Sequence, residues 1–177
     1  GVNSARAAGL RPDYQIGDWD SGGAPEEGVP CITLPVEKDM TDLQAAADQA
    51  LSLGFRELLL CGCMGGRLDH TAANLVLLEW IAGRGGRALM VDEDNEARLL
   101  EGPAELRLPN RPSYRYLSLV PLDRTLTGVT LRGLKYPLTQ ATLTRGDTLS
   151  VSNEPAAAEM TVALASGRAL LIRSQRN

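Results

Sequence analysis

The hydrophobic pattern of this 177-residue chain changes near residue 95, and this change restricts the possible folds most strongly. Before residue 95, short apolar runs typical of strands alternate with longer segments whose apolar residues recur at helical spacing. In chain order these segments are DYQIGD, GVPCITLP, TDLQAAADQALSLG, RELLLCGC, HTAANLVLLEWIAGRGG and RALMVDED. Alternating strands and helices predict an α/β layer with a parallel sheet. The continuous apolar run RELLLCGC favours a strand covered on both faces, as parallel strands usually are.

After residue 95 the chain consists of short apolar runs separated by Gly, Pro, Asn and Asp. These runs are ARLLEG, YRYLSLVPL, GVTLRG, TLSVSNE, MTVALASG and ALLIRS. Short strands with frequent turn residues are typical of an antiparallel sandwich or barrel. The sequence therefore predicts two domains, an α/β domain over residues 1–94 and an all-β, antiparallel β-sandwich domain over residues 95–177.

The charged residues are distributed unevenly along the chain. The formal net charge is −4, but residues 1–94 carry 15 acidic and 7 basic residues, whereas residues 95–177 carry 7 acidic and 11 basic residues. A nucleic-acid-binding protein would be expected to show a basic stripe, so this distribution argues against one. A carboxylate-rich half instead suits hard cations such as Mg²⁺.

Membrane association and export are not expected from the sequence. No window approaches the ~18 uninterrupted apolar residues of a membrane span, and no basic-then-apolar signal peptide opens the chain. Cys31, Cys61 and Cys63 lack zinc-type spacing, and the Cys61-Gly-Cys63 sequence favours buried thiols over a disulfide. We therefore expect the reducing cytoplasm as the location of this protein.

Polar clusters follow the predicted strands of the first half. They are GDWDS, EKDMTD and GCMGGRLDH, and they contain Asp18, Asp20, Asp39, Asp42, Arg67, Asp69 and His70. Ligands of open α/β sheets bind outside the carboxyl ends of the strands, so these side chains are expected along one rim. Converging carboxylates repel one another unless cations neutralise them. A complex of Mg²⁺ with a polyphosphate would do so, and Arg67 would add a forked donor for phosphate oxygens.

Each cluster also has an ordinary structural interpretation. Asp-x-Asp beside Gly22-Gly23 is typical of a turn, and Thr41 with Asp42 is typical of a helix start. Gly65-Gly66 is compatible with a tight turn, Asp69 with an N-cap, and His70 with a packing residue. The chain has neither a Walker A sequence nor a G-x-G-x-x-G sequence, so the common phosphate loops are absent.

Five motifs in a fixed order strengthen the functional interpretation. They are PDYQIGDWDS, EKDMTDLQAAADQAL, GCMGGRLDHTAANLVLL, GLKYPL and SNE. This ordered series resembles that of the thiamine pyrophosphokinase family. The resemblance extends through essentially the whole chain and is strongest over residues 12–78 and 128–172.

The resemblance implies a Rossmann-like α/β domain that binds ATP and Mg²⁺ and a C-terminal β-sandwich that binds thiamine. It implies transfer of an intact diphosphate from ATP to the hydroxyl of thiamine, which yields thiamine diphosphate and AMP. It also implies a homodimer whose active sites lie between the subunits.

The resemblance also assigns roles to residues of the first half. Asp18 and Asp20 resemble the Mg²⁺-binding pair, and Asp39, Thr41 and Asp42 resemble a second acidic motif near the phosphates and thiamine. The phosphate-side loop corresponds to Gly65, Gly66, Arg67, Asp69 and His70, with Asn74 one helical turn further on. Either Asp42 or Asp69 would accept the proton of the attacking hydroxyl. Catalysis would rest mainly on positioning and electrostatics.

In the second half, the resemblance places Tyr136 against the thiamine ring, where stacking and cation–π contact suit the cationic ligand. Ser152 and Asn153 match the segment that hydrogen-bonds the pyrimidine. Without the resemblance, Tyr136 would be interpreted as a half-buried strand residue and SNE as a plain turn.

Two departures from the family pattern are visible. The segment GVNSARAAGLRPD resembles the tail of an Asp-Gly-Gly-Ala-Asn motif with Val2 in place of Ala, without the preceding strand and its aspartate. Trp19 stands where the family usually has Phe. Two alternatives to the kinase remain. Resemblance of fold does not exclude a related diphosphotransferase acting on another alcohol such as a pterin, and the missing aspartate leaves open an inactive protein that binds thiamine or nucleotide.

Overall fold

The computed structural model describes residues 2–19, 24–35, 37 and 39–175. Three helices are present in this part of the chain: α1 (Val2–Ala7), α2 (Asp42–Ser52) and α3 (Leu68–Gly83). The strands of the first half are β1 (Gln15–Gly17), β2 (Cys31–Thr33), β3 (Glu57–Cys61) and β4 (Arg87–Val91). The later strands are β5 (Asn95–Glu101), β6 (Ala104–Pro109), β7 (Tyr116–Pro121), β8 (Thr125–Arg132), β9 (Leu138–Thr144), β10 (Glu159–Leu164) and β11 (Arg168–Ser174).

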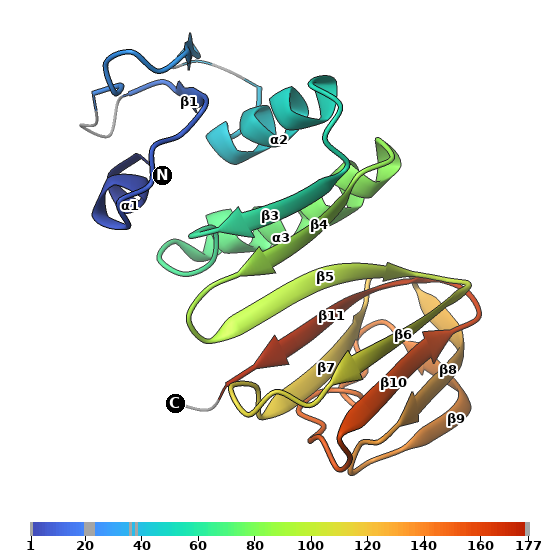
Figure 1. Cartoon of the computed structure of the whole chain (residues 1–177). Helices are drawn as coiled ribbons and strands as arrows, with labels where there is room; N and C mark the ends of the chain where they lie inside the picture. Colours follow the sequence, from blue (N-terminus) through green and yellow to red (C-terminus); the bar gives the residue numbers. More distant parts are fainter. Residues whose placement is uncertain (1, 20–23, 36, 38, 176–177) are drawn as a thin grey trace.

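The described strands form three sheets (Figure 1). The first is a two-stranded parallel pair of β1 and β2. The second has five strands in the order β3-β4-β5-β11-β7, and the third has four strands in the order β6-β10-β8-β9. Because β4 pairs with β5 and β5 pairs with β11, the five-stranded sheet continues across residue 94.

Only part of the predicted parallel sheet forms. β3 pairs with β4 in parallel, but β1 and β2 lie in a separate sheet and β5 runs antiparallel to β4. The cause of the reversal at β5 is a short turn after Val91. Asp92 Oδ1 accepts hydrogen bonds from the N–H groups of Asp94 (2.9 Å) and Asn95 (2.7 Å). A turn this short joins only antiparallel strands, since a parallel pair needs a long crossover.

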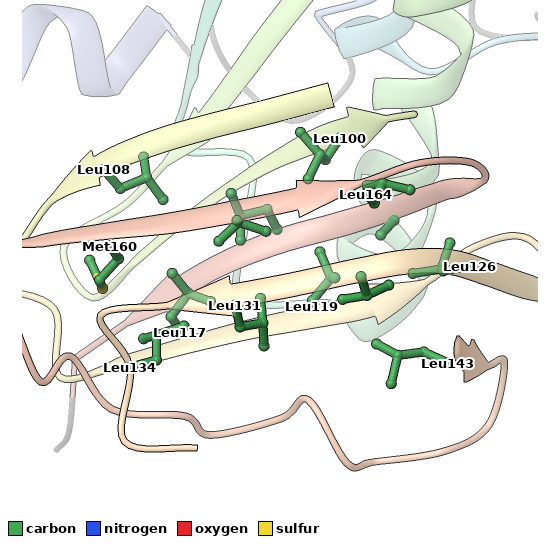
Figure 2. Close-up of a cluster of buried hydrophobic side chains, with 14 residues drawn as sticks. Leu100, Leu108, Leu117, Leu119, Leu126, Leu131, Leu134, Leu143, Met160 and Leu164 are labelled. Carbon is green, nitrogen blue, oxygen red and sulfur yellow. The ribbon is translucent and has the colours of Figure 1, made fainter. Parts of the chain in front are cut away.

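Strands after residue 95 pair in antiparallel fashion, as the sequence predicted. The run TLSVSNE is the exception, because residues 148–154 lie in the connection between β9 and β10 and form none of these strands. The four-stranded sheet packs against the β5, β7 and β11 part of the five-stranded sheet. The core between them includes Leu117, Leu119 and Leu131, each at most 1% exposed (Figure 2). Alternation of apolar residues along each strand points one set of side chains into this core.

Helix α2 begins as the sequence predicted. The hydroxyl of Thr41 is the N-cap and accepts a hydrogen bond from the Gln44 N–H at 3.2 Å. Helix α3 packs on the other core, where Leu77, Leu78 and Ile81 are buried together with Met90 of β4. Among the described helices, none combines the length and the apolar character that a membrane crossing requires.

Candidate functional site

Asp18 and Asp42 are brought to one corner of the molecule, at the end of β1 and the start of α2. Asp18 is half-buried and follows Gly17, the last residue of β1, whereas Asp42 is exposed and is the first residue of α2. The Asp42 Oδ2 atom lies 3.6 Å from the position that a Cβ atom on Gly17 would occupy. A Cβ there would make only ordinary van der Waals contact, so the distance shows simply that this carboxylate lies beside the backbone of β1. Asp39 is exposed and lies two residues before the Thr41 cap.

Trp19 follows Asp18 in a conformation that its sequence did not suggest. Its φ angle is +61°, in the left-handed region that is uncommon for a bulky residue and costs free energy. Its indole Nε1 is buried and has no hydrogen-bond partner among the described residues. The predicted metal ligand Asp20 follows directly and lies outside the described residues.

The loop from Gly62 to Arg67, between β3 and α3, is held by two side chains of α3. Thr71 Oγ1 accepts a hydrogen bond from the Gly65 N–H at 3.2 Å, and it lies 3.3 Å from the carbonyl oxygens of Gly65 and Arg67. Asn74 is buried and donates from Nδ2 to the Cys63 carbonyl at 2.7 Å. Asn74 thus fixes the backbone of the loop. Motif comparison did not single out Thr71, whose only sequence signal is its place in the first turns of a helix.

Glycines allow the sharp path of this loop. Gly65 (φ +92°) and Gly66 (φ +69°) are both in the left-handed region, and a Cβ at either position would meet no atom within 4 Å. Their role is therefore conformational, because they give the backbone a turn that other residues adopt at a cost.

Arg67, Asp69 and His70 gather at the start of α3. Arg67 Nη2 lies 2.6 Å from Asp69 Oδ2, and Asp69 Oδ1 accepts a hydrogen bond from the His70 N–H at 2.9 Å. The hydrogen bond from Arg67 holds the pKa of Asp69 below its ordinary value. All three residues are exposed. The N-cap position belongs to Arg67, so the interpretation of Asp69 as the cap was wrong.

Cys61, at the end of β3, and Cys63, in the loop itself, are both free thiols, and only Cys63 is partly buried. Cys61 is exposed because it ends β3 at the edge of its sheet, so the prediction of two buried thiols was wrong for this residue. Cys63 is half-buried and donates to the Leu60 carbonyl at 3.5 Å. Burial raises the pKa of the Cys63 thiol to about 11.

Tyr136, Ser152 and Asn153 lie together in a different part of the molecule, around the connection between β8 and β9 (Figure 1). Tyr136 is 58% exposed and is not in a strand, so its interpretation as a half-buried strand residue was wrong. Asn153 is 2% exposed, and its side chain is hydrogen-bonded to both backbone polar groups of Tyr136. Ser152 is exposed, with φ +59°, and its N–H donates to Ser118 Oγ at 3.0 Å.

Two carboxylates, Asp18 and Asp42, lie at the corner of β1 and α2. Mg²⁺ is usually held by one or two protein carboxylates together with waters and substrate phosphates. The residue types at this corner therefore fit such an ion. Over the described ranges, no group of three or more His, Cys, Asp or Glu side chains that could hold a metal ion is found.

Comparison with known proteins gives the same family for both halves of the chain. Residues 1–88 match the family model described as "Thiamin pyrophosphokinase, catalytic domain", and residues 104–168 match "Thiamin pyrophosphokinase, vitamin B1 binding domain". A thiamine pyrophosphokinase of Bacillus subtilis is 32% identical over 173 residues, which cover 94% of this chain and 80% of that protein.

Solved structures agree with the sequence comparison. The structure of the thiamine pyrophosphokinase from Bacillus subtilis superposes with a TM-score of 0.90 at 29% identity, covering 100% of this chain and 85% of that one. The thiamin pyrophosphokinase from Geobacillus thermodenitrificans gives a TM-score of 0.85 at 33% identity, covering 99% of this chain and 83% of that one. The motif series, the two matched halves and the shared fold agree, and this chain belongs to the thiamine pyrophosphokinase family.

Proposed function

We propose that this protein is a thiamine pyrophosphokinase, which transfers diphosphate from ATP to the hydroxyl of thiamine and releases thiamine diphosphate and AMP. The observation that carries the proposal is the match of both halves of the chain, in order, to the catalytic and the vitamin B1 binding models of one family. A pterin acceptor is not favoured, because the second half matches the model for the vitamin.

The two halves have separate roles in this proposal. Residues 1–94 bind ATP and Mg²⁺ as a Rossmann-like α/β domain, and residues 95–177 bind thiamine as a β-sandwich. Asp18 and Asp42, at the corner of β1 and α2, and the loop from Gly62 to Arg67 all belong to the first half, which supports this division. So does the position of the exposed Tyr136 ring in the second half.

Asp18 and Asp20 hold Mg²⁺ in the proposed site, and the carboxylate of Asp42 lies beside the same end of β1. Bound Mg²⁺ would neutralise charge on the transferred phosphates. Asp42 is the better candidate for the residue that accepts the proton of the thiamine hydroxyl. Asp69 is paired with Arg67, and its lowered pKa makes it a weaker proton acceptor.

The triphosphate of ATP contacts the loop before α3. The backbone N–H of Gly66, the guanidinium of Arg67 and the ring of His70 supply donors there, since all three residues are exposed. Gly65 contributes the left-handed turn of the loop, because its own N–H is already bonded to Thr71 Oγ1. Thr71 and Asn74 act indirectly, by holding the loop in position. Asp39 and Thr41 flank the start of α2 beside the same substrates.

Thiamine lies against Tyr136, with Ser152 beside it. Asn153 contributes by holding the backbone of Tyr136. We further propose a cytoplasmic homodimer in which the ATP side of one subunit faces the thiamine side of the other. Figure 1 supports this arrangement, since β1 and α2 lie at one end of the molecule and β8 and β9 lie at the other.

The test is the production of AMP and thiamine diphosphate from ATP, Mg²⁺ and thiamine by the purified full chain. We expect equal amounts of both products, and neither product when thiamine is left out. A pterin alcohol offered in place of thiamine should give no AMP above this background. A folded protein that binds thiamine but forms no AMP would instead support the inactive binding protein.

A further inference from the structure

Residues 134–136 and 153–155, which are separate in sequence, are joined by contacts that hold the backbone of Tyr136. Asn153 Oδ1 accepts from the Tyr136 N–H at 2.9 Å, and Asn153 Nδ2 donates to the Tyr136 carbonyl at 2.8 Å. The Lys135 N–H donates to the Glu154 carbonyl at 2.9 Å, and Leu134 forms an antiparallel bridge with Pro155. All of these contacts involve the backbone of residues 134–136. The backbone that carries the ring is therefore held without help from neighbouring charges.

One cation lies beside this exposed ring, and a carboxylate pairs it with a second cation. Lys135 Nζ lies 5.4 Å from the centre of the Tyr136 ring and 3.0 Å from Glu154 Oε1. Arg115 Nη2 lies 4.0 Å from Glu154 Oε2. Within the described part of the chain, Glu154 forms the ion pairs of both Lys135 and Arg115. The three side chains together carry a net charge of about +1 at neutral pH.

Such a cluster would repel a cationic ligand if its carboxylate were absent. Thiamine carries a permanent positive charge on its thiazolium ring. A ligand stacked on Tyr136 would lie close to the ammonium of Lys135, where like charges disfavour binding. The pKa of Glu154 lies below its ordinary value because Lys135 donates a hydrogen bond to it, so this carboxylate is ionised at neutral pH.

We propose that Glu154 is a specificity-determining residue: its negative charge offsets part of the positive charge of Lys135 and Arg115 and so reduces the repulsion of a cationic aromatic ligand at Tyr136. This inference rests on the proposed function, because it concerns the ligand of the same face. It goes further in assigning the selection for a cation to the charge balance around the ring, in addition to the ring itself.

The structure allows this charge to be varied in steps, because backbone contacts hold Tyr136. The unchanged chain and the double variant Lys135→Met/Glu154→Gln have the same net charge on this face. Glu154→Gln raises the net charge of this face by one, because it removes a negative charge. Lys135→Met lowers the net charge by one. The full-length variants should be compared by isothermal titration with thiamine and with an uncharged analogue in which a neutral ring replaces the thiazolium. The buffer should have low ionic strength.

We expect the Kd for thiamine to rise about 5-fold in Glu154→Gln and to fall by a similar factor in Lys135→Met. It should return to the unchanged value in the double variant. The Kd for the neutral analogue should change less than about 2-fold throughout, and ~0.5 M NaCl should reduce all the differences. Glu105→Gln is the matched control, since Glu105 pairs with Arg107 on β6 and should leave both Kd values unchanged.

Equal changes for the charged and the neutral ligand would overturn the inference, because Glu154 would then act on the shape of the site. An unchanged Kd for thiamine in Glu154→Gln would also overturn it. If the unchanged chain makes thiamine diphosphate and the variants give either of these results, only this inference fails. If the unchanged chain neither binds thiamine nor forms product, the proposed function fails with it.

Discussion

Asn74 and Asn153 both use a buried amide side chain to hold a backbone segment of the candidate site. Asn74 donates to the Cys63 carbonyl beneath the glycine loop, and Asn153 is bonded to both polar groups of the Tyr136 backbone. A buried amide without partners would cost free energy, so these hydrogen bonds also stabilise the fold. At the residue scale, part of the motif series therefore encodes support for the backbone of the candidate site.

The choice between Asp42 and Asp69 as the proton acceptor can be tested by replacing each with Asn. Asp42→Asn should lower kcat by about 100-fold or more, because general-base catalysis contributes at least this factor. Asp69→Asn should lower kcat less than about 10-fold and mainly raise KM for ATP, because it frees Arg67 from its partner. Steady-state kinetics with varied ATP and thiamine would measure both. The reverse pattern would assign the proton transfer to Asp69.

Trp19→Phe should leave the protein as stable or stabilise it by about 1 kcal/mol. The substitution removes a buried indole N–H that has no partner among the described residues, and an unsatisfied buried donor costs about 1–3 kcal/mol. Urea unfolding at pH 7 measures the difference. Trp80→Phe is the contrasting control, since the Arg84 guanidinium lies 3.6 Å from the centre of the Trp80 ring and should lose cation–π attraction. Marked destabilisation by Trp19→Phe would mean that the indole N–H has a partner in solution.

At the scale of elements, β5 and β11 are joined by a buried ion pair as well as by backbone hydrogen bonds. Glu96 and Arg173 are register partners, and Arg173 Nε lies 2.7 Å from Glu96 Oε1. Both side chains are at most 5% exposed. Arg98 Nη2 lies 3.2 Å from the same carboxylate oxygen, and Arg173 Nη1 donates to the Pro109 carbonyl. Removing one partner of such a pair leaves a buried charge uncompensated.

Glu96→Gln should therefore destabilise the fold by about 3 kcal/mol at pH 7, as measured by urea unfolding. Burial raises the pKa of Glu96, but the hydrogen bond and charge of Arg173, together with the charges of Arg98 and Arg111, lower it more, so its net pKa lies below the ordinary value. A lowered folded-state pKa means that the stabilisation is complete above the unfolded-state pKa of about 4.3 and is lost as the pH falls through the folded-state pKa. The difference between Glu96→Gln and the unchanged chain should accordingly shrink below about pH 4.

The exposed pair of Glu105 and Arg107 provides the comparison for this buried pair. Exposed ion pairs contribute about 0–1 kcal/mol, so Glu105→Gln should change the free energy of unfolding by less than that amount. Similar losses in the two variants would show that burial of the Glu96 pair carries no special stabilisation.

At the scale of the whole molecule, the proposed dimer makes a quantitative prediction for mixed subunits. If Asp42 of one subunit and Tyr136 of the other complete each active site, inactive Asp42→Asn and Tyr136→Ala proteins should complement each other. Random exchange of subunits gives about half heterodimers, each with one intact site, so about a quarter of the unchanged activity should return. Activity is measured after mixing and refolding from urea. No recovery, with heterodimers present by mass, would place each active site within a single chain.

Much of the local structure could be predicted from the sequence by itself. The Thr41 cap of α2 and the antiparallel strands after residue 95 both follow from short-range patterns. The apolar run RELLLCGC does form β3, but the expectation that this strand is covered on both faces was wrong, because β3 is an edge strand and Leu59 is 63% exposed. Capping and strand periodicity depend on residues only a few positions apart, so they are visible in the sequence without knowledge of the fold. The ordered motif series likewise points to the family, because it depends only on residue identity and spacing along the chain.

Tertiary structure alone decided how these elements and side chains combine. The separation of β1 and β2 from β3, and the reversal at β5, depend on pairing between strands that the helical and strand periodicities do not specify. The partner of Asn153 lies 17 residues away, and that of Arg173 lies 77 residues away. Such hydrogen bonds are determined by which backbone and charged groups are buried next to each other, and burial is a property of the folded chain. For this reason the sequence identified the residues of the candidate site, whereas only the structure separated the exposed side chains, such as Tyr136, from the buried ones, such as Asn153, that hold the backbone in place.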